Sequence, residues 1–564
     1  MGARCDGGSD ACGRVVERHS GEATTTFTYD SAGHLVAAVT PDTRLALTRD
    51  ALGRVVTEEC DGRALHSTYD ILGRRVERRT PSGAVSRWEW DANNRPTRIR
   101  LADHALSFTY GASGHEIERR LGETAVLSQE WDAGHRLTSR TVLGQAASDT
   151  GPSGEALLQR SYTYGQDGSL AAVEDQTYGV RRFTRDRLGR VETVSATGWS
   201  ERYAYDAAGN VSGADAPEGV QGRRVHDGTL IRRAGHITYV HDAQGRLVRQ
   251  TRKLLSGGTR EWTYAWDAED RLTQVTTPDG RRWAYVYDGL GRRVAKRLLS
   301  DDGRPVEETV FTWDSSHLVE QSSSAGGPTQ SWEWAPGTNR ALLQSDQDEV
   351  DRRFYAIVTD LVGTPTELVD DEGRIAWRSR TTLWGTPLGG AADRVDCPLR
   401  FPGQYHDPET GLHYNFRRYY DPENARYISP DPLGLAPAPN HHAYVPDPLR
   451  WTDPWGLVSC ESSRHGIAEE REAHIEGQHG PGAQDRVREN ADPTGPEPSL
   501  PGEFYDDFLW DGDTSPSADG SGRASTGPRP YPTPAPGPDR TLTGTASTTA
   551  NRWASTAAGG KPAP

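Results

Sequence analysis

The stretch Tyr69-Asp-Ile-Leu-Gly-Arg74 contains the motif that decides the fold: an aromatic residue, Asp, two variable residues, Gly and Arg. Asp can bond its own backbone and Gly takes positive φ without steric cost, so the motif predicts a tight turn. The leading residue recurs, at first every 20 or 21 positions, as Tyr29, Arg49, Tyr69, Trp90, Tyr110, Trp131, Tyr164, Arg185, Tyr205, His241, Trp266 and Tyr287. A period of this size indicates a repeat architecture in which units stack on their neighbours.

The residues that lead into each turn alternate in polarity, as in Ser86-Arg-Trp-Glu-Trp90 and Glu261-Trp-Thr-Tyr-Ala-Trp266. This alternation predicts strands with one apolar and one wet face. Each unit is therefore expected to be a β-hairpin, and the array an all-β solenoid. An ordinary all-β sandwich is the alternative. Ser9-Asp-Ala-Cys-Gly-Arg14 resembles another turn, so the chain is expected to begin inside the array and to leave an edge strand exposed.

Composition excludes several classes of function. The net charge of −16 disfavours nucleic-acid binding by the shell. No window is apolar for long enough to span a membrane, and the N-terminus lacks the profile of a secretory signal. The five Cys are scattered without metal-ligand spacing, so we expect reduced thiols, no metal site and no cofactor.

A second motif marks the end of the array. Arg418-Tyr-Tyr-Asp-Pro-Glu-Asn-Ala-Arg-Tyr-Ile-Ser-Pro-Asp-Pro-Leu-Gly-Leu435 is echoed by Asp453-Pro-Trp-Gly-Leu457. Asp-Pro is a common turn opener, and spacing alone favours a structural role for both Asp residues. The sequence after Leu457 shows no trace of the repeat.

The array resembles the tyrosine-aspartate repeats of Rhs proteins. Further segments resemble the Rhs-associated core: 354–370, Trp384-Gly, 398–415 and the two Asp-Pro-x-Gly-Leu endings. The resemblance covers about residues 10–457. It implies a polymorphic toxin whose hairpins spiral into a β-shell, a partial cocoon similar to that of insecticidal toxin complexes and teneurins. It also implies three regions: a repeat shell over 1–340, truncated at its N-terminus, a core with a self-cleavage motif over 341–457, and a variable region over 458–564.

The same resemblance assigns roles to individual residues. Asp431 and Asp453 match the family's two carboxylates and Arg418 the arginine that assists them, and the cleaved bond is then Leu457-Val458. Two carboxylates held close together cannot both ionise cheaply, so one keeps a proton while the other activates water. His442 and Asp447 depart from the family pattern. The additional acid Asp447, together with Pro437 and Pro439, is expected to shift the loop between the Asp-Pro motifs.

The C-terminal region gives the weakest signal. Residues 462–479 could form one helix that carries His474, for which a solvated helix is the default and a nuclease or metal site the alternative. From Asp492 onward Pro, Gly, Ser and Thr dominate, interrupted by the apolar stretch 504–510, and this composition predicts disorder.

Three functions therefore compete. The first is a toxin-enclosing shell that cuts itself after Leu457, with its own C-terminal passenger, an immunity protein and a secretion component as partners. It would be cytoplasmic before export by a specialised route to the surface or medium. The second is an extracellular repeat protein that binds carbohydrate or protein without catalysis. The third is a nuclease or hydrolase acting through the C-terminal region.

Overall fold

The structure is a computed structural model that describes residues 6–144, 156–349, 351–389 and 395–461. The chain divides into one unit over Met1–Asp513 and another over Thr514–Pro564, and all described residues belong to the first. Every regular element in the described ranges is a β-strand. The predicted helix over 462–479 and the predicted disorder of the C-terminal region lie outside the described residues.

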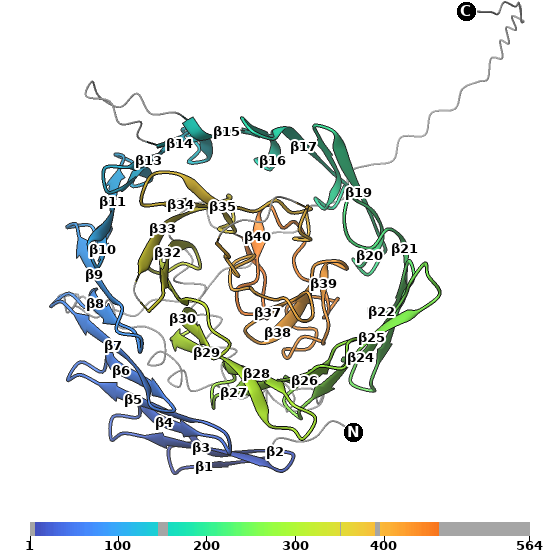
Figure 1. The fold of residues 1–564 in the computed structure, drawn as a ribbon, viewed down its shortest axis with the longest axis horizontal. Helices are drawn as coiled ribbons and strands as arrows, with labels where there is room; N and C mark the ends of the chain where they lie inside the picture. Colours follow the sequence, from blue (N-terminus) through green and yellow to red (C-terminus); the bar gives the residue numbers. More distant parts are fainter. Residues whose placement is uncertain (1–5, 145–155, 350, 390–394, 462–564) are drawn as a thin grey trace, which may run out of the picture. The chain divides into compact units, whose positions relative to one another are not determined.

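One antiparallel sheet of 35 strands accounts for the whole repeat array. Each strand pairs with the strands before and after it in the sequence, from the pairing of β1 with β2 to that of β34 with β35. The sheet is therefore a meander built from successive hairpins, and it winds around later parts of the same chain (Figure 1). The all-β, spiralling repeat fold predicted from the sequence is confirmed.

We call β1–β26 the outer turn of this sheet. Its strands are β1 Asp6–Ser9, β2 Val15–Ser20, β3 Ala23–Tyr29, β4 Leu35–Val39, β5 Arg44–Arg49, β6 Val55–Cys60, β7 Arg63–Tyr69, β8 Arg75–Arg79, β9 Val85–Trp90, β10 Pro96–Leu101, β11 His104–Tyr110, β12 Glu116–Leu121, β13 Ala125–Trp131, β14 Leu137–Gly144, β15 Ala156–Tyr164, β16 Leu170–Asp175, β17 Gly179–Arg185, β18 Val191–Ala196, β19 Trp199–Tyr205, β20 Val211–Asp215, β21 Gly222–Asp227, β22 Leu230–Ala234, β23 Ile237–His241, β24 Leu247–Lys253, β25 Thr259–Trp266 and β26 Leu272–Thr276.

The inner turn, β27–β35, continues the same sheet. Its strands are β27 Arg282–Tyr287, β28 Arg293–Leu299, β29 Pro305–Asp314, β30 His317–Ser323, β31 Thr329–Trp334, β32 Ala341–Gln347, β33 Arg352–Thr359, β34 Pro365–Asp370 and β35 Ile375–Arg378. The core segment, residues 395–461, then adds a four-stranded sheet and a two-stranded ladder. Its strands are β36 Tyr405–Asp407, β37 Leu412–Asn415, β38 Arg418–Asp421, β39 Arg426–Tyr427, β40 Trp451–Thr452 and β41 Cys460–Glu461.

The repeat turn has the predicted geometry, with one addition. Tyr69 ends β7, Gly73 takes a φ of 85°, and the Asp70 carboxylate accepts the backbone N–H groups of Leu72 and Arg74. In addition, Nε of Arg74 donates to the other carboxylate oxygen of Asp70 at 2.7 Å. The Arg therefore closes the turn with its side chain before the returning strand begins at Arg75.

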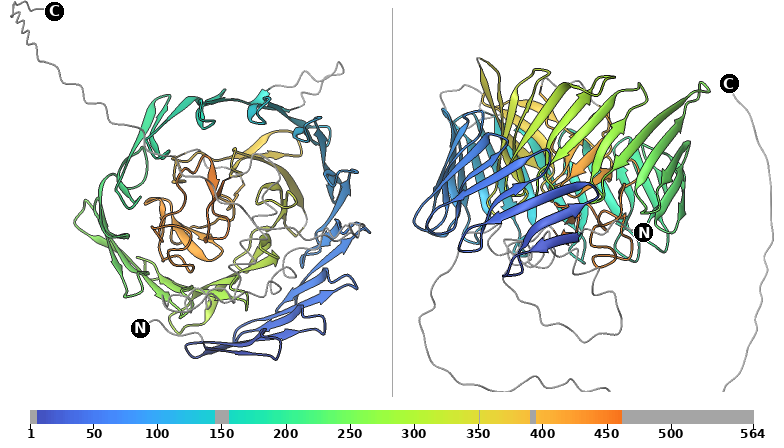
Figure 2. Two further views of the ribbon diagram at one scale, coloured as in Figure 1. Left: turned by 180° about the vertical axis from the view of Figure 1, so that it is seen from behind. Right: turned by 90° about the horizontal axis from the view of Figure 1, so that it is seen from below.

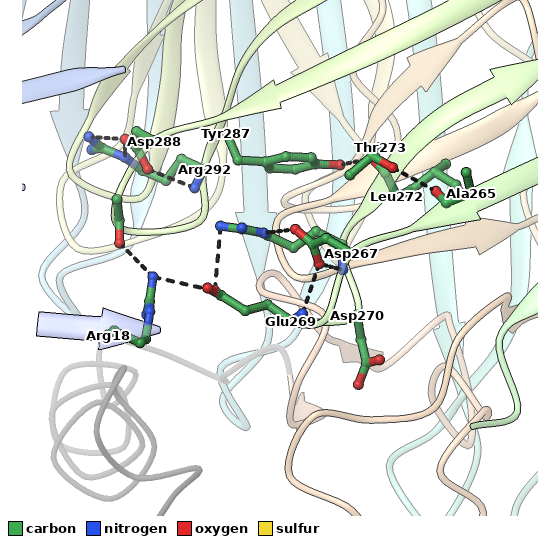
Figure 3. Close-up of polar contacts among 12 residues, drawn as sticks. Arg18, Ala265, Asp267, Glu269, Asp270, Leu272, Thr273, Tyr287, Asp288 and Arg292 are labelled. Carbon is green, nitrogen blue, oxygen red and sulfur yellow. Dashed lines mark hydrogen bonds and ion pairs between the residues drawn. The ribbon is translucent and has the colours of Figure 1, made fainter. Parts of the chain in front are cut away.

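The leading aromatic residue joins each unit to the one before it. The Tyr69 hydroxyl donates to the Val55 carbonyl at 3.0 Å, and the Arg54 guanidinium lies 5.0 Å from the centre of the Tyr69 ring. The same hydroxyl-to-carbonyl bond is made by Tyr29, Tyr110, Tyr164, Tyr205 and Tyr287. Figure 3 shows the bond from Tyr287 to Leu272. These aromatic side chains hold the array together.

Inward-pointing arginines of the outer turn bind the inner turn. Arg78 forms an ion pair with Asp314 at 3.1 Å, and the Arg160 guanidinium binds the Glu367 carboxylate. At the start of the sheet Arg18 reaches Glu269 at 3.3 Å and the Gly289 carbonyl at 3.1 Å (Figure 3). Segments more than 200 positions apart in the sequence therefore form two packed layers, visible from a second direction in Figure 2.

The two layers differ in burial. Outer strands such as β3 alternate buried with exposed residues, as the sequence pattern predicts. Inner strands such as β32 and β34 are buried on both faces, because the outer turn covers one face and the core segment packs near the other. The wet face expected of every hairpin is therefore absent from these inner strands.

The first predicted turn forms as expected, with Nε of Arg14 donating to Asp10 at 2.7 Å and Gly13 at a φ of 80°. The short strand β1 precedes this turn and pairs with β2. Among the described residues there is no helix with the length and apolarity that a bilayer crossing demands. The region boundaries at 340/341 and 457/458 remain predictions.

Candidate active site

The core segment brings the three predicted site residues together. Arg418 begins β38, Asp431 lies in the turn that follows β39, and Asp453 comes directly after β40. All three side chains are buried, with 2%, 7% and 1% of their surface exposed. Residues that the sequence separates by 35 positions thus share one water-poor site.

A single guanidinium nitrogen serves both carboxylates. Nη2 of Arg418 lies 2.9 Å from Oδ2 of Asp431 and 3.2 Å from Oδ2 of Asp453. Its Nη1 donates to the His441 carbonyl at 3.1 Å, and its Nε donates to the Gly456 carbonyl. One cation therefore orients two anionic groups and, at the same time, the backbone of the predicted substrate.

Each carboxylate also closes its own Asp-Pro turn. Oδ1 of Asp431 accepts the Leu433 N–H at 2.8 Å, and Oδ1 of Asp453 accepts the Leu457 N–H at 2.8 Å. The structural interpretation of Asp-Pro is thus correct as far as it goes, because both residues act as turn openers. The Oδ2 atoms of both residues take no part in these turns and lie beside Arg418 instead.

The electrostatics of the pair favour one bound proton. Burial raises the pKa of Asp431 to about 6, against the opposing effects of Arg418 and the Leu433 N–H, and the nearby charge of Asp453 raises it further. A buried carboxyl with a pKa near the working pH is suited to hold and donate a proton. Burial is the main physical reason for the raised pKa of Asp431, and the neighbouring Asp453 contributes in the same direction.

The segment Asp453–Leu457, which we call the strap, is tightly held. Gly456 has a φ of 67°, and a Cβ there would lie 2.6 Å from the Asn415 carbonyl oxygen. On the other side, a Cβ on Gly403 would overlap the Pro454 backbone. Only glycine fits at both positions, so the backbone itself shapes the slot in which the strap lies.

The predicted cleavage bond lies at the end of the strap. Leu457 is buried, and Val458 is half-buried. After it, β41 pairs with β40, with Thr452 opposite Cys460 and Trp451 opposite Glu461. The Leu457 carbonyl is one residue beyond the Gly456 carbonyl that Arg418 already binds, and the β40–β41 ladder holds the chain on both sides of the bond.

The outer turn supports the site from behind. Nε2 of His442 makes a 3.1 Å hydrogen bond with the Gly245 carbonyl, and Nδ2 of Asn440 donates to Oδ1 of Asn210 at 2.9 Å. Asp447 pairs with Arg185 at 2.8 Å. The two residues that depart from the family pattern, His442 and Asp447, therefore attach this loop to the wall.

Two polar residues of the site escape sequence reasoning. The Tyr427 hydroxyl donates to Oδ2 of Asp453 at 2.7 Å and accepts from Nδ2 of Asn415 at 2.7 Å. The Arg418 guanidinium lies 3.7 Å from the centre of the Tyr427 ring. Both residues belong to stretches that carry the resemblance, yet no spacing separates Tyr427 from the other 20 tyrosines of the chain.

The fold and the site together define a class of protein. It is a β-shell built from repeats, with two buried carboxylates beside a segment of the same chain. Comparison with known families gives a match to the RHS protein model over residues 354–388 and to the RHS Repeat model over 241–282 and 266–304. The chain therefore contains RHS repeats between residues 241 and 304 and a segment of the RHS protein type over 354–388. Within the described ranges, no three His, Cys, Asp or Glu side chains gather in a way that could hold a metal ion.

Two curated relatives are similar over about half of the chain. The double-stranded DNA deaminase toxin A of Burkholderia cenocepacia is 34% identical, over 54% of this chain and 23% of its own length. The probable deoxyribonuclease RhsA of Dickeya dadantii is 33% identical, over 53% of this chain and 22% of its own length. The chain thus spans about a quarter of the length of these relatives.

Solved structures share the fold at low sequence identity. A Tc holotoxin pore of Photorhabdus luminescens aligns over 83% of this chain and 28% of the other with a TM-score of 0.63 and 18% identity. The TcdB2-TccC3 crystal structure aligns over 81% of this chain and 28% of the other chain, with a TM-score of 0.55 and 16% identity. The chain therefore has the shell fold of Tc toxin proteins.

Proposed function

We propose that this protein is a toxin-enclosing shell that cuts its own chain between Leu457 and Val458 and thereby separates its C-terminal region. The observation that carries the proposal is the contact of Arg418 with Asp431, Asp453 and the strap at once. Curated relatives named as toxins, and the Tc shell fold, support the same assignment.

The proposed reaction is a hydrolysis. Ionised Asp453 takes a proton from a water molecule as the water oxygen bonds to the Leu457 carbonyl carbon. Protonated Asp431 gives its proton to the Val458 nitrogen as the C–N bond breaks. The products are a carboxylate at Leu457 and an amine at Val458. Positioned acid and base groups each contribute about 100-fold to 10,000-fold to such a rate.

Arg418 has a further part in this step. Its Nε binds the carbonyl of Gly456, the residue directly before the Leu457 carbonyl that becomes an oxyanion, so a positive charge is held one residue from the reacting group. Donors fixed before the reaction stabilise developing charge without reorganisation. Because the strap is part of the same chain, substrate and carboxylates are brought together by folding, and one turnover completes the task.

The two alternative functions receive less support. Carbohydrate binding by the repeats would need free aromatic side chains, whereas six of the leading tyrosines bond carbonyls of neighbouring units. A nuclease or hydrolase activity would reside in the C-terminal region, outside the described residues. The immunity protein, the secretion component and the specialised export route belong to the same proposal as the toxin passenger.

The test is the intact mass of the purified full chain under denaturing conditions, beside its Asp431→Asn and Asp453→Asn variants. We expect the wild type to give two fragments that meet at Leu457-Val458 and both variants to remain whole. Asp447→Asn is the matched control, because it removes a nearby buried carboxylate that pairs with Arg185 instead of Arg418. A wild-type chain that stays whole would overturn the proposal.

A further inference from the structure

Asp453 and Asp431 share Arg418 but differ in their other donors. Oδ2 of Asp453 accepts the Tyr427 hydroxyl at 2.7 Å as well as Nη2 of Arg418. Oδ2 of Asp431 has the Arg418 contact at 2.9 Å, and its second oxygen accepts a backbone N–H. The hydroxyl bond is therefore the side-chain contact that distinguishes the two acids.

The direction of the Tyr427 hydroxyl is fixed by its neighbour. Nδ2 of Asn415 donates to the Tyr427 oxygen at 2.7 Å, so the hydroxyl proton points away from Asn415 and toward Asp453. The same Nδ2 donates to the Asp453 carbonyl at 2.8 Å. Asn415 is itself fully buried and lies at the end of β37, beside the strap. The Tyr427 hydroxyl therefore donates in one direction, and the buried Asn415 that fixes it is itself held in place.

Tyr427 is also suited to remain a donor. Burial raises the pKa of its hydroxyl well above the ordinary value, and the charge of Asp453 raises it further. A hydrogen bond donated to a carboxylate favours the ionised carboxylate, and it has no such effect on the partner that lacks it. The asymmetry decides which acid of the pair keeps the shared proton.

We propose that Tyr427, held by Asn415, is a positioning residue that keeps Asp453 as the anionic base and so assigns the proton of the pair to Asp431. This inference rests on the proposed self-cleavage. Tyr427 acts through Asp453, and its loss is expected to change the pH dependence of cleavage as well as its rate.

Other titratable groups face the pair from every side of the site. Arg418 and Tyr427 belong to the four-stranded sheet, while His441 and Tyr444 come from the loop between the Asp-Pro motifs, with Cys460 beyond Tyr444. Burial, with Asp453 nearby, raises the pKa of Tyr444 well above its ordinary value. Burial, followed by Arg426 and Arg418, lowers the pKa of His441. These shifts keep the Tyr444 hydroxyl and the His441 imidazole neutral near neutral pH, whereas burial raises the pKa of Asp431 to about 6.

The experiment follows cleavage of newly made full-length chain. A short cell-free translation with labelled leucine is chased into buffers of increasing pH, and the ratio of whole to cut chain gives the rate. We expect Tyr427→Phe to slow cleavage by about 10-fold to 100-fold. We also expect the acidic limb of its pH profile to move upward by about one unit, because Asp453 loses a donor to its charged form.

Tyr420→Phe is the matched control. Tyr420 pairs with Tyr427 across β38 and β39, is fully buried, and donates its hydroxyl to the Trp384 carbonyl at 2.9 Å. Its loss removes a comparable bond from the same sheet without touching either acid, so the pH profile should match that of the wild type. Circular dichroism melting of each variant shows whether it has folded.

The outcomes separate the inference from the proposed function. A wild type that cuts together with a Tyr427→Phe variant that cuts at the same rate and pH overturns the inference and leaves self-cleavage standing. A wild type that never cuts overturns both. If Tyr427→Phe does not fold, Asn415→Ser replaces it, since the ring remains and the hydroxyl loses its fixed direction. A several-fold slower rate with the same upward shift then supports the inference, and an unchanged profile overturns it.

Discussion

The repeat turns and the candidate site both use Asp, Arg and Tyr, but they connect these residues differently. In the turn that follows Trp131, Asp132 has its own arginine, Arg136, with Nε at 2.8 Å. In the site, Asp431 and Asp453 share Arg418. The tyrosine hydroxyl of a repeat donates to a backbone carbonyl, whereas that of Tyr427 donates to a carboxylate.

The difference is a matter of charge balance. The Arg136 hydrogen bond, together with backbone N–H groups, holds the pKa of Asp132 below its ordinary value, so this carboxylate has a full counter-charge and no use for a proton. In the site one cation serves two acids, and burial raises the pKa of Asp431 to about 6. Asp132 thus has an arginine to itself and serves the turn. Asp431 shares Arg418 with Asp453 and has a raised pKa, which suits it to hold a proton.

Removal of the shared cation should have the largest effect on cleavage. We expect Arg418→Met to abolish cleavage and to destabilise the fold by about 3 to 5 kcal/mol, because two buried carboxylates lose the arginine that they share. Intact mass reports the first effect and thermal melting the second. Arg136→Met, which breaks a partly exposed repeat turn, is the control and should cut normally. Full cleavage by Arg418→Met would contradict the comparison.

The retained proton should appear in the pH dependence. If Asp431 donates a proton to Val458, the cleavage rate falls as pH rises through about 6, the pKa to which burial raises this acid. Above that value the protonated fraction drops about tenfold per pH unit. The pulse-chase rate at stepped pH measures it. A rate that stays level across this range would mean that Asp431 is not the proton donor.

The linked effect on stability has a definite sign. The folded chain keeps the Asp431 proton up to about pH 6, while the unfolded chain releases it near the ordinary value of 3.8. The folded state then binds more protons between these values, so its stability falls as pH rises through this window. The repeat-turn carboxylates of Asp50, Asp70 and Asp132, whose pKa values are lowered, have the opposite sign.

Substitutions within the repeats should leave cleavage intact and affect only stability, by amounts set by burial. Asp288 is fully buried against Arg292, whereas Asp70 and Arg74 are each about one-fifth exposed. We expect Asp288→Asn to cost about 3 kcal/mol and Asp70→Asn about 0.5 kcal/mol. Thermal melts of both variants in the uncut Asp431→Asn background measure the difference. Equal shifts would show that position in the wall does not matter.

Much of the fold could be predicted from the sequence because its rules are local. All twelve leading residues end a strand, from Tyr29 in β3 to Tyr287 in β27. The Asp and Gly of each motif impose the turn through their own backbone, whatever surrounds them. The gathering of Arg418, Asp431 and Asp453 was also predicted, although from a family resemblance and not from spacing.

The rest could not be predicted because it depends on distant partners. Nothing near Arg160 indicates that its charge meets Glu367, 207 positions later. The closing role of Arg in each turn was missed for a different reason, since an Arg after Gly is equally suited to solvent. Tyr427 was missed because its function depends on Asn415 and Asp453, which no periodic pattern connects to it.

The pairing of each strand with its sequence neighbour has a consequence for the order of assembly. Hairpins of this kind can be laid down one after another as the chain leaves the ribosome, since no strand waits for a distant partner. The loop before the strap is different, because its residues His442 and Asp447 bind Gly245 and Arg185 of a wall made earlier. If the chain cuts itself as we propose, the cut marks a late step of biosynthesis, because this loop can attach to the wall only after the wall has formed.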